Sequence, residues 1–234
     1  MLEINNLYVN IGNLSIIQDV SLSIGDGEIV ALIGANGMGK TTLVRAISKL
    51  NGIKSGKMFF KGEDITDLTA DKIVEKGIIQ VPEGRKLFPQ MSVIENIEMG
   101  AYAKRARAKE KENLEYVFSV FPELKPMLKQ ACGNLSGGQQ QMVAIARSIM
   151  ASPELLILDE PSIGLSPIAT QKMFDAIELI NKSGIGILIT EQNVQQVLKM
   201  ADTAYAMQQG KIALSGKASE IASNEELKKI YIGM

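Results

Sequence analysis

The opening third of the chain consists of short apolar runs separated by turn residues. Such runs cover residues 2–9, 15–24 and 28–33, with Gly12 after the first and the turn Gly25-Asp26-Gly27 after the second. Apolar runs of this length that end at glycines are typical of β-strands. We therefore expect a sheet-rich N-terminal third.

From Gly39 onward, helical and strand-like patterns alternate, which favours a parallel α/β core. Residues 92–127 interrupt the alternation with a charged, helical segment that looks inserted. No linker-like segment divides the chain, so we expect a single domain. The expected elements are helices over 39–49, 70–76, 136–151, 167–181 and 193–200, strands over 77–81, 155–158 and 185–190, strand pairs near 57–61 and near Tyr205 and Ile212, and short amphipathic helices over 219–231.

The composition excludes several classes of protein. The chain has 25 Lys and Arg against 26 Asp and Glu, a net charge of −1, which argues against a dedicated duplex-DNA binder. Cys132 is the one cysteine, and histidine is absent, so an internal disulfide, His-ligated metal sites and His-based triads are excluded. The first residues lack the pattern of a signal peptide, and no apolar run is long enough to cross a bilayer. These features predict a cytosolic protein.

A phosphate-binding loop is the strongest motif. The run from Gly34 to Thr42 satisfies G-x-x-x-x-G-K-[ST], and it lies between an expected strand and an expected helix. Glycines let successive N–H groups converge on a phosphate, Lys40 adds a positive charge, and Thr41 can ligate Mg²⁺. We expect the nucleotide phosphates to contact Gly34, Asn36, Gly37, Gly39, Lys40, Thr41 and Thr42.

Two carboxylates end a second apolar strand. The run 155–158 is followed directly by Asp159 and Glu160. In enzymes with such a phosphate loop, the aspartate at a strand end anchors Mg²⁺ and a neighbouring carboxylate can polarise the attacking water. Asp159 is therefore the expected metal ligand, and Glu160 is the expected catalytic carboxylate beside Lys40.

The third motif, Leu135-Ser136-Gly137-Gly138-Gln139, opens a helix upstream of the acidic strand. Ser136 and the amides of Gly137 and Gly138 form a second anion site at a helix N-terminus. Together the three motifs resemble the nucleotide-binding domain of ABC transporters over essentially the whole chain. The resemblance implies a P-loop NTPase α/β core with an N-terminal antiparallel β subdomain, within one domain of residues 1–234, and a helical subdomain inserted at about residues 84–151. It also implies ATP and Mg²⁺ as cofactors and a head-to-tail dimer in which each signature closes on the partner's phosphate loop.

Finer features narrow the family. Glu83-Gly84-Arg85, Glu191-Gln192-Asn193 and the ending Tyr231-Ile232-Gly233 resemble the shorter ATPase subunit of branched-chain amino acid importers. This implies an ATPase that is peripheral on the inner face of the cell membrane. Its implied partners are integral membrane permease subunits, a second ATPase subunit that is identical or different, and an extracytoplasmic solute-binding protein, with no nucleic acid.

Some positions depart from the general ABC pattern. Glu83 replaces a glutamine that usually enters the helical subdomain, and we expect it to join Thr41 and Asp159 as a metal ligand, whereas Gln80 lies inside the preceding strand. Gln192 stands at the position of the switch histidine, where it can donate a hydrogen bond to the γ-phosphate without carrying a charge.

Two further departures concern the nucleobase and the dimer. Ile11 replaces the aromatic residue that usually stacks on adenine, so only apolar contact is expected there, and Tyr8 is expected to point to the other face into the core. Ser166 replaces an aspartate that many relatives carry, which weakens any role in communication between subunits.

Several alternatives stay open. The apolar residues of the segment 87–102 are either core or part of a groove for a membrane subunit, and the basic run 104–111 is either a solvated face or a lipid contact. For the function, a soluble ABC ATPase of DNA repair or translation would carry a coiled-coil insertion or tandem domains, and a P-loop GTPase would carry an N-K-x-D run, none of which occurs. A regulatory subunit with weak hydrolysis is the third alternative, because the switch histidine is missing.

Overall fold

The computed structural model describes residues 1–223, which divide into two compact units. The first unit contains residues 1–73 and 186–223. The second unit contains residues 74–185. Each unit is described by itself.

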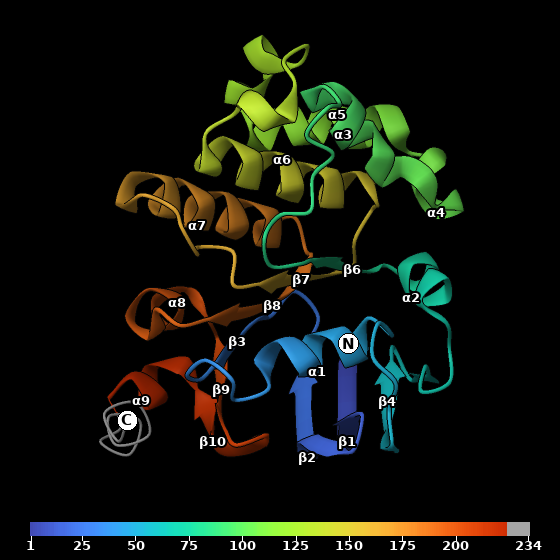
Figure 1. The fold of residues 1–234 in the computed structure, drawn as a ribbon, viewed down its shortest axis with the longest axis vertical. Coiled ribbons are helices and arrows are strands. Elements are labelled where there is room, and N and C mark those ends of the chain that lie inside the picture. The colour runs from blue at the N-terminus through green and yellow to red at the C-terminus, as the bar shows by residue number, and fades with distance from the viewer. Residues whose placement is uncertain (224–234) are drawn as a thin grey trace. The chain divides into compact units, whose positions relative to one another are not determined.

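An antiparallel sheet opens the first unit (Figure 1). Its strand order is β2-β1-β4-β5, and β1 pairs antiparallel with both β2 and β4. One face of β1 is apolar, because Leu2, Ile4, Leu7 and Val9 are buried. The expected N-terminal β subdomain is confirmed. Its strands are β1 (Leu2–Ile11), β2 (Leu14–Ile24), β4 (Ser55–Phe60) and β5 (Glu63–Asp64).

A second set of strands in the first unit has the order β10-β9-β3-β8. β3 runs parallel to both β8 and β9, and every residue of β3 and β8 is buried. Strands buried on both faces appear in a sequence as continuous apolar runs, which is how the sequence predicted them. The elements are β3 (Ile29–Ile33), β8 (Gly186–Glu191), β9 (Thr203–Gln208), β10 (Lys211–Lys217), α1 (Lys40–Ile47), α8 (Val194–Met200) and α9 (Ala218–Ala222).

The second unit contains two parallel strands and most of the helices. β6 (Ile78–Val81) pairs with β7 (Leu155–Asp159), and the long helices α6 (Gly137–Met150) and α7 (Pro167–Lys182) pack against each other (Figure 1). α2 (Ala70–Lys76) lies where the chain passes from the first unit to the second. The remaining elements are α3 (Val93–Glu98), η1 (Met99–Tyr102), α4 (Lys104–Arg107), α5 (Glu110–Val120), η2 (Pro122–Met127) and η3 (Cys132–Asn134).

The segment expected to be charged and helical is helical, but it consists of short pieces. Ala103, between η1 and α4, has extended backbone angles, and prolines 122 and 126 lie in η2, where they restrict the backbone. The amphipathic helices expected over 219–231 fall largely outside the described residues, as does the ending 231–233. In residues 1–223 we find no helix with both the length and the apolar character needed to cross a membrane.

Candidate functional site

The residues predicted from the motifs are divided between the two units. In the first unit lie Ile11, the phosphate loop 34–42 and Gln192, and in the second lie Glu83, Ser136, Gly137, Gly138, Asp159 and Glu160. The local geometry of each group follows separately.

The phosphate loop has a shape that only glycine permits at two positions. A Cβ added at Gly34 would lie 2.7 Å from the carbonyl oxygen of Met207 in β9. Gly39 has a φ of 103°, and a Cβ there would lie 2.9 Å from the Cδ1 atom of Ile17. L-residues with side chains rarely adopt that conformation. The tight approach of β9 and the left-handed turn together fix the loop at the start of α1.

Lys40 holds its charge inside this loop. The side chain is 4% exposed, and its Nζ donates hydrogen bonds to the carbonyl oxygens of Gly34 at 2.6 Å and Ala35 at 3.2 Å. Thr41 and Thr42 follow in the first turn of α1, which contains no acidic residue. An ammonium group and helix N–H groups without a local carboxylate favour an anion at this place.

Strand register places Gln192 near the start of the phosphate loop. β3 and β8 are parallel, and their last paired residues are Ile33 and Glu191. Gly34 and Gln192 come directly after these two residues, so both lie at the carboxyl ends of neighbouring strands. Gln192 is exposed, and its backbone N–H donates to the Oε2 atom of Glu191 at 3.3 Å. The carboxyl ends of parallel strands are the usual place for ligands in α/β proteins.

Ile11 ends β1 and forms an exposed apolar pair with Leu14. The two residues are register partners across the β1–β2 hairpin, and their exposed fractions are 48% and 69%. Tyr8 is only half-buried, between the buried residues Leu7 and Val9, so the prediction that Tyr8 belongs to the core is wrong. Register shifts along β1 break the strict alternation on which that prediction rested.

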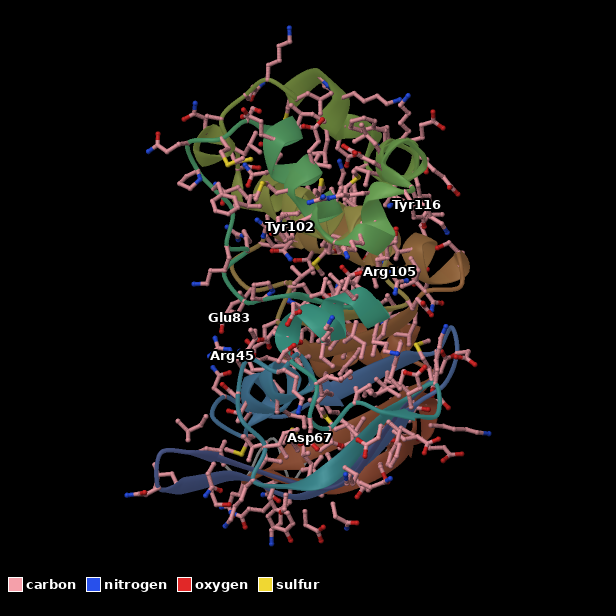
Figure 2. All side chains as sticks on the ribbon, turned by 90° about the vertical axis from the view of Figure 1, so that its right-hand side faces the viewer. Arg45, Asp67, Glu83, Tyr102, Arg105 and Tyr116 are labelled. Carbon is pink, nitrogen blue, oxygen red and sulfur yellow. The ribbon has the colours of Figure 1, made fainter. Side chains whose placement is uncertain are left out.

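In the second unit, register brings the acidic residues to one strand edge. β6 and β7 are parallel with Val81 opposite Leu158, so Glu83 and Glu160 each lie two residues beyond paired positions. Asp159 is 2% exposed and Glu160 is 8% exposed, whereas Glu83 is exposed on the loop after β6 (Figure 2). Gln80 lies within β6, as predicted.

The signature turn is built as a helix cap. The Ser136 side chain accepts from the N–H of Gln139, and the Gln139 side chain accepts from the N–H of Ser136. This capping box fixes the first turn of α6. Gly138 packs so closely against α7 that a Cβ there would lie 2.8 Å from the Cβ atom of Ala169.

One arginine and one buried asparagine near these residues have contacts that the sequence did not reveal. Arg147, in the last turn of α6, donates to the carbonyl oxygens of Arg85 and Lys86, both at 3.0 Å. Asn96 is fully buried and hydrogen-bonds both backbone groups of Phe88. These partners are 62 and 61 residues away for Arg147, so no local pattern could have revealed them. The helix α3 also contains Glu95 and Glu98, so its sequence did not single out Asn96 as a buried polar residue.

Three apolar side chains from the segment 87–102 are exposed. Phe88, Met99 and Tyr102, which we call the exposed apolar patch, have exposed fractions of 46%, 46% and 78%. The guanidinium of Arg147 lies 6.0 Å from the Phe88 ring, and that of Arg107 lies 5.4 Å from the Tyr102 ring. The interpretation of these three residues as core is therefore wrong.

The basic run is mostly a solvated face, with one exception. Lys104, Arg107, Lys109 and Lys111 are exposed. Arg105 instead turns inward, donating to the backbone carbonyl of Glu75 at 3.1 Å and to the Glu154 carboxylate at 3.0 Å (labelled in Figure 2). Burial lowers the pKa of Arg105.

The available donors suit a hard cation completed by other oxygen ligands. Mg²⁺ prefers oxygen ligands, and each unit carries a candidate donor: the Thr41 hydroxyl in the first unit and the buried Asp159 carboxylate in the second. Among residues 1–223, no three acidic or cysteine side chains gather into a self-contained metal site. An ion bound to either donor would therefore need phosphate or water oxygens among its remaining ligands.

Comparison with known proteins agrees with these features. Residues 17–163 match the ABC transporter family. The chain is 38% identical over 233 residues to the high-affinity branched-chain amino acid transport ATP-binding protein BraG of Pseudomonas aeruginosa, covering 100% of both chains. It is 33% identical to the lipopolysaccharide export system ATP-binding protein LptB of Haemophilus influenzae, covering 100% of this chain and 97% of the relative. A crystal structure of a nucleotide-free ATP-binding cassette from an ABC transporter superimposes with a TM-score of 0.87 at 28% identity, covering 100% of this chain and 99% of that one.

Proposed function

Because the chain belongs to the ABC transporter family and is an ATPase of that family, we propose that it powers an importer of branched-chain or related amino acids. The observation that carries this proposal is the full-length identity of 38% to BraG. The runs Glu83-Gly84-Arg85 after β6 and Glu191-Gln192-Asn193 after β8 add support, because both resemble the shorter ATPase subunit of branched-chain amino acid importers.

The residues of the first unit bind the nucleotide. Lys40 holds the β- and γ-phosphate oxygens, with the amides of the glycine-rich loop and the Thr42 hydroxyl around them. Ile11 offers an aliphatic surface to the base. Gln192 donates a hydrogen bond to the γ-phosphate and stays neutral at every pH that the protein meets, unlike histidine.

The residues of the second unit supply the acidic and signature groups. Asp159, Thr41 and Glu83 would hold Mg²⁺, and the bound ion would neutralise charge on the phosphates. Glu160 accepts a hydrogen bond from the attacking water and orients it in line with the γ-phosphorus. Because positioning and charge stabilisation dominate phosphoryl transfer, a buried carboxylate at a fixed strand end suits that role.

Two subunits complete the reaction. Ser136, Gly137 and Gly138 bind the γ-phosphate held on the phosphate loop of a second subunit, so a head-to-tail dimer contains two composite sites. The second subunit is a copy of this chain or a related ATPase. Closure of the dimer and its release after hydrolysis supply the conformational work.

The exposed apolar patch fits the permease. Phe88 and Tyr102 offer aromatic surface and Met99 offers a flexible thioether, a combination that adapts to a partner helix. The chain would then sit on the inner face of the cell membrane through its permease subunits. An extracytoplasmic solute-binding protein delivers the amino acid in the complete importer.

One second candidate has a specific observation behind it. The identity of 33% to LptB over the whole chain supports an ATPase of lipopolysaccharide export, which would require no solute-binding protein. Both candidates use the same nucleotide chemistry, so the membrane partners distinguish them.

The test isolates the complex that the chain forms. The tagged chain is purified in mild detergent from its native membranes, and stoichiometric partners are identified by mass spectrometry. The complex is then reconstituted into vesicles with the ATPase subunits and ATP on the inside and the solute-binding protein outside. We expect two permease subunits and uptake of labelled leucine or valine, abolished in the matched Glu160→Gln complex. Recovery of export components without amino acid uptake would replace the import proposal, and recovery of the chain without integral membrane proteins would favour a soluble ABC ATPase.

A further inference from the structure

A left-handed turn follows β6 in the second unit. Gly84, Arg85 and Lys86 have φ angles of 73°, 65° and 47°. Such angles are unfavourable for residues with side chains, and they persist where the surroundings impose them. Arg147 imposes this turn, because its two terminal nitrogens donate to the carbonyl oxygens of Arg85 and Lys86 at 3.0 Å each. Burial lowers the pKa of Arg147, yet an arginine starts high enough to remain charged.

The turn directs the Arg85 side chain onto the signature turn. The Nη1 atom of Arg85 donates to the Oε1 atom of Gln140 at 3.2 Å. A Cβ added at Gly137 would lie 3.2 Å from Nη2 of the same guanidinium. The group therefore lies against the first turn of α6, where a side chain at position 137 would require the guanidinium to shift by a few tenths of an ångström.

Arg85 also borders the loop that follows Glu160. A Cβ added at Gly164 would lie 3.9 Å from Nη2 of Arg85. The guanidinium thus lies among the loop of Glu83, the signature turn and the loop after the catalytic carboxylate, all within the second unit. Among the described residues, no acidic side chain forms a salt bridge with Arg85.

Gln140, which accepts from Arg85, also binds the backbone just before the helix cap at Ser136. Its Nε2 atom donates to the carbonyl oxygens of Cys132 at 3.1 Å and Leu135 at 3.3 Å. Arg85, through Gln140, therefore holds the backbone that leads into Ser136. A charged donor to this amide is stronger than a neutral one, and its removal loosens the turn.

We propose that Arg85 is a positioning residue for ATP hydrolysis, which holds the signature turn ready for the terminal phosphate bound to a second subunit. This inference rests on the proposed function, since the signature turn acts on the nucleotide of the other subunit. The contacts of Arg85 lie at the signature turn and beside the loop after Glu160, within the second unit. Its loss should therefore weaken ATP-driven dimerisation without changing the affinity of the monomer for nucleotide.

The test uses the Glu160→Gln chain as parent, with Arg85→Gln, Arg85→Lys and the matched control Lys86→Gln added. Lys86 is the neighbouring, exposed cation of the same turn. Dimerisation with ATP is followed by sedimentation velocity, and binding of fluorescent ADP to the monomer is measured in parallel. We expect Arg85→Gln to raise the ATP concentration for half-dimerisation about tenfold, the cost of one charge-assisted hydrogen bond. Arg85→Lys should raise this ATP concentration less than Arg85→Gln does, and Lys86→Gln should leave it equal to that of the parent.

A second readout needs no dimer. In the monomer, hydrogen exchange of the amides at residues 136–140 should be about tenfold faster in Arg85→Gln, by the same hydrogen-bond argument, and unchanged in Lys86→Gln. Equal exchange and equal dimerisation in Arg85→Gln and its parent would overturn the inference. A parallel loss of ADP affinity and folding in Arg85→Gln would also overturn it, since that result marks a purely structural residue. A parent that never dimerises with ATP contradicts the proposed function instead, and the exchange rates then decide the inference alone.

Discussion

Replacing Asn96 by alanine should destabilise the second unit by an amount that the contacts allow us to work out. Asn96 lies in α3 with no solvent exposure. Its Oδ1 accepts from the N–H of Phe88 at 2.9 Å, and its Nδ2 donates to the carbonyl oxygens of Phe88 at 3.0 Å, Ser92 at 3.0 Å and Met91 at 3.3 Å. Alanine removes all of these bonds at once.

The three carbonyl groups keep a second partner after the change. The Phe88 oxygen still accepts from the N–H of Met91, the Met91 oxygen from that of Cys132 and the Ser92 oxygen from that of residue 96. Within residues 1–223, the Phe88 N–H donates to no other acceptor, so it is the one group left without a partner. The Nδ2 group has two hydrogens, so its three contacts count as about two bonds at about 1 kcal/mol each. The orphaned Phe88 donor adds about 1 kcal/mol, the lower end of its usual range, because water reaches the exposed Phe88, and the total is about 3 kcal/mol.

Urea unfolding at fixed pH measures this loss, and Asn96→Asp is the matched control. Aspartate retains the acceptor for the Phe88 N–H, but at pH 7 it places a buried carboxylate against three carbonyl oxygens, so it should be no more stable than the alanine variant. This environment raises the pKa of the new carboxyl in the folded state. The free energy of unfolding of the aspartate variant should therefore increase relative to that of the alanine variant as the pH falls. A loss below about 1 kcal/mol for Asn96→Ala, or an aspartate variant as stable as the original chain at pH 7, would refute the reasoning.

Other predictions follow from single contacts. Lys40→Ala should weaken ATP binding by about a hundredfold or more, from the loss of a buried charge at the phosphates, and equal affinity by calorimetry would contradict the phosphate-loop assignment. Gly34→Ala should also abolish binding, since its Cβ would meet the Met207 carbonyl oxygen at 2.7 Å, and unchanged binding would show that β9 can move away. Gln192→His should raise turnover near pH 6, where the imidazole is charged, and a rate equal to or below that of the original chain at that pH would count against the γ-phosphate contact. Cys132 is 1% exposed and burial raises the pKa of its thiol, so at pH 8 a thiol reagent should label it only when the second unit opens, and immediate labelling would contradict this burial.

Much of the fold could be predicted because the signals are local. β3 and β7 are continuous apolar runs, and they are buried at every position. Ser136 and Gln139 stand at capping-box spacing, and α6 begins directly after Ser136. The glycines of the phosphate loop likewise predict its backbone conformation, because Gly37 and Gly39 adopt positive φ angles that other residues rarely adopt.

The rest depended on contacts between distant residues. The apolar spacing in the segment 87–102 cannot tell whether another element covers it, and the structure leaves Phe88, Met99 and Tyr102 exposed. In the sequence Arg105 looks like its exposed basic neighbours. In the structure its guanidinium is partly buried and donates hydrogen bonds to residues 75 and 154. Arg85 and Arg147 acquire their roles only when a left-handed turn lies alongside α6.

Phosphate release by the purified chain tests the central claim, an ATPase whose two composite sites form in a dimer. The account predicts Mg²⁺-dependent release that rises more steeply than in proportion to protein concentration and falls at least about a hundredfold in Glu160→Gln, while that variant still binds ATP. Release that Glu160→Gln leaves within about tenfold of the original rate would contradict the assignment of Glu160 and with it the proposed reaction.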